Sequence, residues 1–391
     1  MTRRHMGPAT NDLHHCDIGY FSHGGPRGGH HPCPACCQGN EVAASTIKGW
    51  TQRYVEERRM GVSRTLAFKF ITQGIINCFT NKPLVVSFEV THSCTANCRH
   101  CDKGGKRDEP LATPEQLRSV YDEIKPLVVQ ISGGEPLLRD DILDVVRAIK
   151  NPGSLPFIVF ISNASLLTED IYIELKNAGV DQFGISLDFP DERHDENRRI
   201  PGLYGHLSDL IPRLSKKGCN DIGIITAITR ANLPYLLDIV KQVEEWNVNV
   251  NFSVYTKLRT GDDSFLISSA EDLQHLRDTI EKLIELKKST STILTSEYVL
   301  RRYLEFFENG SIPNCQAGTR CFVVNPDATM SPCAMKSDLR FRSQKELIEQ
   351  FSRHNDCGEC YVSMRANAEK SIGQILTDSL STYKTLKQRK G

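Results

Sequence analysis

Three cysteines at spacings of four and three follow a short apolar run in Phe88-Glu89-Val90-Thr91-His92-Ser93-Cys94-Thr95-Ala96-Asn97-Cys98-Arg99-His100-Cys101. Such an apolar run is typical of a buried strand. Three thiolates on the loop that follows can ligate three of the four irons of a cubane cluster, which leaves one iron open to a substrate or cofactor. The alternative is a zinc site completed by His92 or His100, but zinc motifs usually pair two cysteine knuckles. Ligand softness and spacing favour iron–sulfur.

Outward from this stretch, strand and helix patterns alternate along the chain. Short runs rich in Val, Ile and Phe predict six strands: Leu84–Thr91, Leu127–Ser132, Phe157–Asn163, Asp181–Leu187, Ile222–Thr229 and Val248–Tyr255. Helical patterns lie between them: Pro114–Lys125, Asp140–Lys150, Thr168–Ala178, Leu207–Lys217 and Leu233–Trp246. This alternation predicts an α/β fold with a parallel sheet, curled into a partial (β/α)6 TIM-like barrel. In such folds the chemistry lies beyond the carboxyl ends of the strands.

Polar or glycine-containing motifs stand at three further strand ends. Ser132-Gly133-Gly134-Glu135-Pro136 follows the second strand, Ile161-Ser162-Asn163-Ala164 the third and Ser186-Leu187-Asp188 the fourth. The two glycines allow the backbone to approach a ligand without a Cβ in the way. Asn163 has a second interpretation as a helix cap. His194-Asp195-Glu196-Asn197-Arg198 comes next along the chain, with Pro201-Gly202 behind it.

In this order the motifs resemble the radical S-adenosylmethionine (SAM) superfamily, whose signature is CxxxCxxC after the first strand of a partial barrel. The resemblance covers residues 83–258 and extends to Cys360 with a second cysteine group. It implies a SAM-binding [4Fe–4S] cluster on Cys94, Cys98 and Cys101. It implies SAM contacts by Gly133, Gly134, Glu135, Pro136, Asn163, Ser186, Asp188 and Arg198. Arg199 competes with Arg198 as the carboxylate partner, and Ala164 stands where the family often has glycine.

The resemblance also implies a mechanism. The amino and carboxylate groups of SAM would chelate the open iron, and one electron would cleave the carbon–sulfur bond to give methionine and a 5′-deoxyadenosyl radical. That radical would abstract hydrogen from the substrate. The protein orients the cofactors and excludes water and oxygen, so the three cysteines are ligands and we expect no catalytic side chain.

A second cysteine group follows the barrel. Cys315-Gln316-Ala317-Gly318 opens it, Cys333 follows a hairpin turned at Asn325–Ala328, and Cys357-Gly358-Glu359-Cys360 closes it. Four thiolates complete a cubane and leave no open iron; a four-cysteine zinc site is the alternative. The group resembles the SPASM domain of the family in its shortened "twitch" form. The resemblance implies an auxiliary [4Fe–4S] cluster on Cys315, Cys333, Cys357 and Cys360, with Cys321 a spare buried thiol and Ala328 in place of a common glycine.

The sequence divides into four predicted segments. Residues 1–45, with Cys33, Cys36 and Cys37, predict a disordered Cys/His-rich tail. Residues 46–82 predict a basic helical extension that packs on the next domain, with a membrane-surface helix as the alternative. Residues 83–290 form the predicted core and residues 291–391 the predicted auxiliary-cluster domain.

Composition limits the class of protein. Lys+Arg and Asp+Glu both total 48, so no global charge points to nucleic acid. There is no signal peptide and no apolar run long enough to span a bilayer, and a cytoplasmic protein is expected. Most of the fourteen cysteines cluster, which fits metal sites on a reduced protein better than a disulfide framework.

The leading hypothesis for function is an enzyme that oxidises or rearranges a small molecule or lipid through hydrogen abstraction. The first alternative is a maturase of a ribosomally made peptide or protein. A second alternative is a non-catalytic metal-binding regulator on the same scaffold. The expected reducing partner is a flavodoxin or ferredoxin.

Overall fold

The computed structural model describes residues 64–150, 154–371, 373–374 and 377. The predictions for residues 1–63, including the Cys/His-rich tail, lie outside this part. The described strands are β1 (Val85–Thr91), β2 (Val128–Gly133), β3 (Phe157–Ser162), β4 (Gln182–Ser186), β5 (Ile222–Ile228), β6 (Asn249–Val254), β7 (Cys321–Val324) and β8 (Met330–Ser331). The helices are α2 (Arg64–Phe79), α3 (Pro114–Ile124), α4 (Ile142–Ile149), α5 (Glu169–Ala178), α6 (Arg193–Arg198), α7 (Leu203–Lys216), α8 (Leu236–Glu245), α9 (Ala270–Ser289), α10 (Glu297–Asn309), α11 (Gln344–Gln350) and α12 (Ser363–Ala368).

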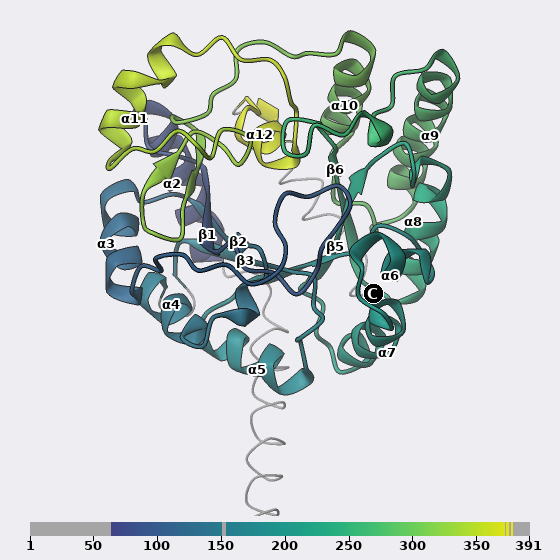
Figure 1. The fold of residues 1–391 in the computed structure, drawn as a ribbon, viewed down its shortest axis with the longest axis horizontal. Helices are drawn as coiled ribbons and strands as arrows, with labels where there is room; N and C mark the ends of the chain where they lie inside the picture. The colour runs from purple at the N-terminus through teal and green to yellow at the C-terminus, as the bar shows by residue number, and fades with distance from the viewer. Residues whose placement is uncertain (1–63, 151–153, 372, 375–376, 378–391) are drawn as a thin grey trace, which may run out of the picture. The chain divides into compact units, whose positions relative to one another are not determined.

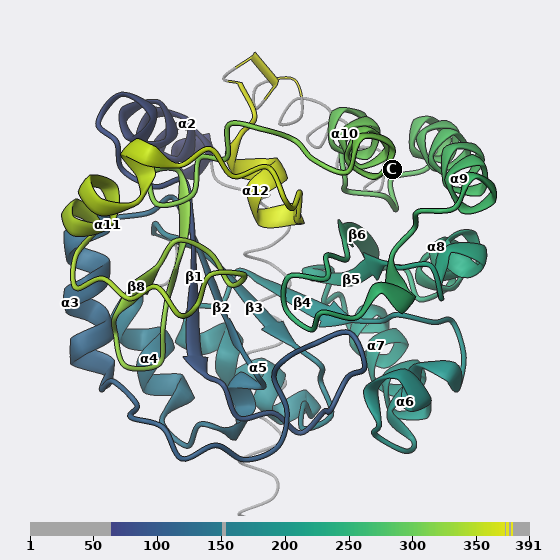
Figure 2. The same ribbon diagram turned by 45° about the horizontal axis from the view of Figure 1, so that its top comes forward.

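The described strands form one sheet in the order β6-β5-β4-β3-β2-β1-β7-β8. β1 to β6 pair in parallel with their sequence neighbours, so each connection crosses over through helix. Figures 1 and 2 show α3, α4, α5, α7 and α8 along the outer side of this sheet. The predicted α/β fold with a parallel, barrel-like sheet is confirmed.

Side-chain alternation explains why the helices cover one face of the sheet. On β3, Ile158 and Phe160 are fully buried while Val159 and Ile161 are half-buried. The helices supply matching apolar stripes. On α4 the buried residues follow helical spacing: Ile142, Val145, Val146 and Ile149. The core therefore lies between the helices and one sheet face, and the other face stays partly accessible.

Helix starts agree with the sequence signals. Thr113 caps α3, where its side chain accepts from the Gln116 backbone N–H and the Gln116 side chain accepts from the Thr113 backbone N–H. Pro114 occupies the first turn, as predicted, because that position has no intrahelical partner for an N–H.

The predicted hairpin around 325–328 is confirmed, since β7 and β8 pair antiparallel on either side of it. The sequence did not predict that β7 also pairs in parallel with β1. Four residues of β7 thus extend the barrel sheet beyond its first strand. The sheet crosses the predicted domain boundary at residue 290, and that boundary stays a prediction.

Helix α2 packs on the domain through one face. Asn77 is buried and donates to the carbonyls of Pro83 and Lys125 at 2.8 and 3.1 Å. Phe70 makes an edge-on ring contact with Phe157. None of the described helices is both long and apolar enough to cross a bilayer.

Candidate functional site

The predicted site residues converge at one edge of the sheet. Cys94 follows β1, Gly133 ends β2, Asn163 follows β3 and Ser186 ends β4. These four strands are parallel neighbours, so their carboxyl ends lie side by side. The convergence expected from the strand pattern is therefore present in the fold.

The loop with the first three cysteines is held by backbone hydrogen bonds from distant segments. The Cys94 N–H donates to the Gly105 carbonyl at 2.9 Å, which closes the loop on itself. The N–H groups of Asn97 and Arg99 donate to the carbonyls of Arg198 and Asn197 at 3.2 and 3.3 Å. The loop is thus fixed between β1 and α6 by contacts that need no metal.

The three thiols of this loop are free and close to one another. Burial raises the pKa of Cys98 to about 11, with smaller contributions from Asp188, Cys101 and Cys94 and an opposing one from Arg198. The backbone N–H of Ala96 donates to Cys94 Sγ at 3.4 Å, and that of Lys103 to Cys101 Sγ at 3.5 Å. Such donors stabilise thiolate ligands, and a cluster bound here would displace protons from these thiols.

The donor set of the loop consists of three soft sulfur atoms, a type of ligand that suits an iron–sulfur cluster. Across the described ranges, no three His, Cys, Asp or Glu side chains converge on a point that one metal ion could occupy. Cluster ligands need not converge in this way, because each thiolate binds a different iron at a different corner. Three soft sulfur donors on one loop fit three corners of a cubane.

Gly133 and Gly134 let the end of β2 press against the segment before Cys94. A Cβ on Gly133 would lie 2.0 Å from the Thr91 carbonyl oxygen, and one on Gly134 2.0 Å from that of Ser93. The Gly134 and Glu135 N–H groups donate to these same two carbonyls at 2.7 and 2.8 Å. The glycines therefore have a structural role, joining the second motif to the cysteine loop.

Glu135 is completely buried beneath this junction. Its carboxylate accepts from Ser162 Oγ at 2.8 Å, the Asn163 N–H at 2.8 Å and the Leu137 N–H at 3.2 Å. Burial raises the pKa of Glu135 to about 7, although these hydrogen bonds act in the opposite direction. Glu135 therefore links the ends of β2 and β3, and Pro136 continues the chain into a short 3-10 turn.

Asn163 contacts the cysteine loop directly. Its Nδ2 donates to Thr95 Oγ1 at 2.9 Å and lies 3.7 Å from Cys94 Sγ. Its side-chain oxygen accepts from the Ser165 N–H, so it also makes the local turn that a capping residue would make. The next residue, Ala164, has φ of +61°, a left-handed conformation that favours the glycine more usual at this position.

Asp188 and Arg198 form a buried ion pair at the end of β4. Arg198 Nε donates to Asp188 Oδ2 at 2.7 Å and Nη2 to Oδ1 at 3.1 Å, while Asn197 Nδ2 donates to Oδ2 at 2.9 Å. Burial alone would raise the pKa of Asp188, but the Arg198 guanidinium and nearby histidines hold it below its usual range. The competitor Arg199 is exposed and caps α6 with φ of +56°.

A buried charged network beside the loop was not predicted from the sequence. His92 lies between two carboxylates, with Nε2 2.9 Å from Glu89 Oε2 and Nδ1 3.1 Å from Glu109 Oε2. Lys103 lies 3.5 Å from the same Glu89 oxygen. Burial raises the pKa of Glu89, yet His92, Lys103 and Arg259 together lower it to about 2. The network therefore keeps the Glu89 carboxylate ionised beside the cysteine loop.

Arg259 connects the loop to the segment after β6. Its Nε and Nη2 both lie 2.7 Å from Asp102 Oδ1, next to Cys101. Thr256, three residues earlier, donates to the Glu359 carbonyl at 3.5 Å. Residues 256–259 therefore contact both cysteine groups.

The second group contains five neighbouring free thiols rather than four. They belong to Cys315, Cys321, Cys333, Cys357 and Cys360. Burial raises the pKa values of Cys333 to about 11 and of Cys360 to about 12, with further increases from the neighbouring thiolates. The pKa of Cys321 is also raised well above its usual value, by burial and then by Cys315, Cys333 and Cys360. Cys321, predicted to be a spare thiol, thus lies within the group.

Arg365 holds the second group together, a role that the sequence did not reveal. It is buried and donates to the carbonyls of Ile312 and Pro313 at 2.7 and 3.1 Å, and also to that of Cys360. Its Nε pairs with Glu369 at 2.8 Å, and the same Glu369 oxygen accepts from the Gln316 N–H. The Arg365 guanidinium thus connects Cys360 to the residues before Cys315 and, through Glu369, to Gln316 after it.

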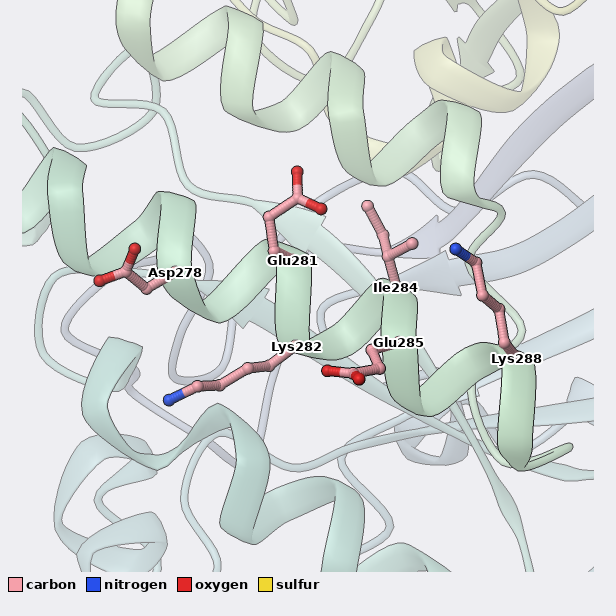
Figure 3. A pocket seen from close by; sticks show the side chains of 6 residues that line it. All are labelled: Asp278, Glu281, Lys282, Ile284, Glu285 and Lys288. Atoms are coloured by element: carbon pink, nitrogen blue, oxygen red, sulfur yellow. The ribbon is translucent and has the colours of Figure 1, made fainter.

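A hollow of about 510 Å³ on α9 contains none of the predicted site residues. Figure 3 shows its lining side chains on a single helix: Asp278, Glu281, Lys282, Ile284, Glu285 and Lys288. Because both charges are represented and no second element contributes, this hollow does not compete with the strand ends as a site.

Comparison with known proteins finds similarity to one superfamily over part of the chain. The Radical SAM superfamily model matches residues 88–243. The AdoMet-dependent heme synthase of Oleidesulfovibrio alaskensis is 28% identical over 214 residues, 53% of this chain and 54% of that protein. The heme synthase of Nitratidesulfovibrio vulgaris is 26% identical over 347 residues, 77% of this chain and 92% of that protein. The first of these alignments thus spans about half the length of the relative.

The fold comparison agrees. SuiB of Streptococcus suis superposes with TM-scores of 0.52 when bound to its precursor peptide SuiA and 0.53 when bound to S-adenosylmethionine, at 16% and 17% identity. Each superposition covers 75% of this chain, and 73% and 72% of SuiB. The sequence match over residues 88–243, the parallel sheet and the cysteine loop at its carboxyl edge agree, and this part of the chain is similar to the Radical SAM superfamily.

Proposed function

We propose that Cys94, Cys98 and Cys101 hold a [4Fe–4S] cluster, at whose open iron SAM binds. When bound and reduced, the cluster and SAM supply a 5′-deoxyadenosyl radical that removes hydrogen from the substrate. The observation that carries this proposal is the junction at the carboxyl edge of the sheet. There Asn163 contacts Thr95, and the Glu135 N–H donates to the residue before Cys94. Two of the SAM motifs are thereby fixed to the cysteine loop.

The side chains around the loop have separate proposed roles. Gly133, Gly134 and Pro136 shape the backbone against which the methionine part of SAM would lie, and Glu135 fixes the ends of two strands. Asn163 and Ser186 offer an amide and a hydroxyl to the ribose. Asp188 holds the Arg198 guanidinium in place, and Arg198 supplies positive charge toward the carboxylate of SAM.

We propose an auxiliary [4Fe–4S] cluster at the second group, on Cys315, Cys333, Cys357 and Cys360. When bound, such a cluster can accept an electron or shape the substrate pocket. The proposal is supported by the proximity of these thiols to one another and by residues 256–259, which touch both groups. It makes residues 291–391 the twitch part of the chain, and a flavodoxin or ferredoxin would reduce the first cluster.

The side chains on the partly accessible face of the sheet indicate which class of substrate could bind there. It carries uncharged amide side chains, among them Gln130, Gln182 and Asn251, all half-buried. A Cβ on Gly223 would lie 3.2 Å from Gln182 Nε2 and 3.9 Å from Asn251 Nδ2, so these two amides flank the glycine. Neutral donors and acceptors suit the hydroxyls of a small molecule or a lipid headgroup.

A second candidate is a maturase that modifies a peptide or protein. Its support is the fold likeness to SuiB, whose structure contains a precursor peptide. The same amide side chains would suit a peptide backbone. The two candidates differ in the class of substrate and not in the proposed chemistry at the cysteine loop.

The test is anaerobic reconstitution with iron and sulfide, followed by dithionite and SAM. We expect 5′-deoxyadenosine from the unaltered chain and none from Cys98→Ala. Cys78→Ala is the matched control, because Cys78 lies on α2 outside both groups. Undiminished 5′-deoxyadenosine from Cys98→Ala, or zinc without sulfide in the purified protein, would contradict the proposal. Adding small-molecule, lipid and peptide pools then identifies the class that increases turnover.

A further inference from the structure

Helix α2 presents an apolar face that no described residue covers. Ile71, Ile75, Ile76 and Phe79 are 39%, 39%, 49% and 78% exposed. Three of them, Ile71, Ile75 and Phe79, follow a spacing of four residues and so lie on one side of the helix. The other large exposed hydrophobic side chains of the described residues are scattered singly: Leu111, Leu138, Leu166 and Leu339. A clustered apolar surface marks an interaction site, whereas scattered residues need no explanation.

This exposure does not come from a loose helix. The opposite side of α2 is fixed by the two Asn77 hydrogen bonds and by the contact of Phe70 with Phe157. Pro83 directly precedes β1 and Phe157 begins β3, so α2 lies at the amino ends of the strands. Figure 2 shows it at the margin of the sheet, beside α11. The face is therefore held outward by a rigid contact, at the edge opposite the cysteine loop.

The charge of this part of the sequence indicates what the face binds. From Arg64, where α2 begins, to Phe88 the sequence contains no Asp or Glu but three basic residues: Arg64, Lys69 and Lys82. Lys69, on α2 itself, is exposed. Such a segment would repel a second copy of itself and attract an anionic surface. A lipid bilayer with anionic headgroups offers both negative charge and apolar depth for the Ile and Phe side chains.

We propose that the α2 apolar face (Ile71, Ile75, Ile76 and Phe79) docks on an anionic lipid bilayer, with Lys69 at the headgroups. The helix lies in the interface without spanning the bilayer. Docking takes place at the edge away from the cysteine loop, so it localises the protein without requiring a lipid substrate. The proposal does not depend on the chemistry proposed above.

The test measures co-sedimentation of the full chain with vesicles of phosphatidylcholine alone or with about one third phosphatidylglycerol. We expect binding to the anionic vesicles that weakens with salt. Ile75→Glu and Phe79→Glu should each lower the partition coefficient about ten-fold or more, since each replaces an inserted apolar side chain by a charge. Lys69→Glu should reduce the preference for anionic vesicles roughly five-fold.

Matched controls separate docking from unfolding. Leu339→Glu alters a side chain of similar exposure, 37% against 39% for Ile75, outside α2, and should leave binding unchanged. Phe79→Trp should retain binding and show a blue-shifted indole fluorescence with anionic vesicles. Absence of binding, or equal binding by Phe79→Glu and the unaltered chain, overturns the proposal. So does a wild-type dimer that Phe79→Glu converts to a monomer without any vesicle binding, because the occupant would then be a second copy.

Discussion

The two cysteine groups differ in how their thiols are brought together. In the first, three cysteines lie within eight residues on one loop, and neighbouring strand ends hold that loop by hydrogen bonds. In the second, five cysteines come from separate segments over 46 residues, one of them the first residue of a strand in the barrel sheet. The first arrangement is local and the second is tertiary. Cysteines on one loop can be recognised as a motif in the sequence. Which cysteines from separate segments come together depends on how the chain packs.

Removing one cysteine from each group should have the largest effects. Cys98→Ala should abolish 5′-deoxyadenosine formation and lower bound iron by about four atoms, while the second cluster remains. Cys360→Ala should lower bound iron by a similar amount and retain SAM cleavage. Iron and sulfide analysis with electron paramagnetic resonance measures both. Loss of both clusters from either variant would show that the groups do not assemble independently.

Gly134→Ala tests whether the first group depends on backbone contact. Because the new Cβ would overlap the Ser93 carbonyl, we expect a loss of about 3 kcal/mol in the free energy of unfolding, with weakened iron binding at the first group only. The matched control is Gly205→Ala on α7, where nothing lies within 4 Å and the free energy should rise by about 0.5–1 kcal/mol. Denaturant unfolding of the metal-free chain measures both, and equal effects would contradict the close-approach argument.

Glu135, next to the first group, should make the free energy of unfolding depend on pH. Its folded pKa of about 7 lies above the usual 4.5, so between these values the folded state binds more protons than the unfolded state. Stability contributed by Glu135 should therefore fall as pH rises from about 4.5 to 7, by roughly 2 kcal/mol. The measurement is the difference in unfolding free energy between the metal-free chain and Glu135→Gln across this range. A difference that stays constant with pH would show that Glu135 titrates normally.

The smallest expected change in stability comes from replacing two alanines, one near each cysteine group. Ala164 and Ala328 have φ of +61° and +68°, where a Cβ is strained. Ala164→Gly and Ala328→Gly should each stabilise the chain by about 1 kcal/mol, since glycine removes the steric cost of a left-handed residue. Thermal unfolding of each single variant is the measurement. A loss of stability at one position would mean that its methyl group packs well enough to outweigh the strain.

The strand pattern could be predicted from the sequence because it is local. Each of the six predicted strands agrees with an observed strand within one residue at both ends, since apolar runs bounded by turns determine both type and extent. The cysteine loop and the glycine motif were predicted for the same reason. Their use as ligands and SAM contacts stays a prediction.

Contacts between residues far apart in the sequence could not be predicted from such local patterns. Arg259 and Asp102 are 157 positions apart, Arg365 and Ile312 are 53 apart, and a single arginine has no spacing that distinguishes it from a surface residue. The pairing of β7 with β1 was not predicted, because a strand of four residues has too little periodicity to indicate which strand it pairs with. Cys321 is a free buried thiol, as expected, but sequence spacing did not reveal that it lies beside the other thiols of the second group.

Local sequence signals were enough to predict the parallel α/β fold, the position of the cysteine loop at a strand end and the order of the motifs, because backbone preference and side-chain alternation act over a few residues. Three other features emerged only from the folded arrangement: Asp188 engages Arg198, five thiols gather in the second group and the apolar face of α2 points outward. These depend on which surfaces remain after the strands and helices have packed, and packing is a property of the whole chain.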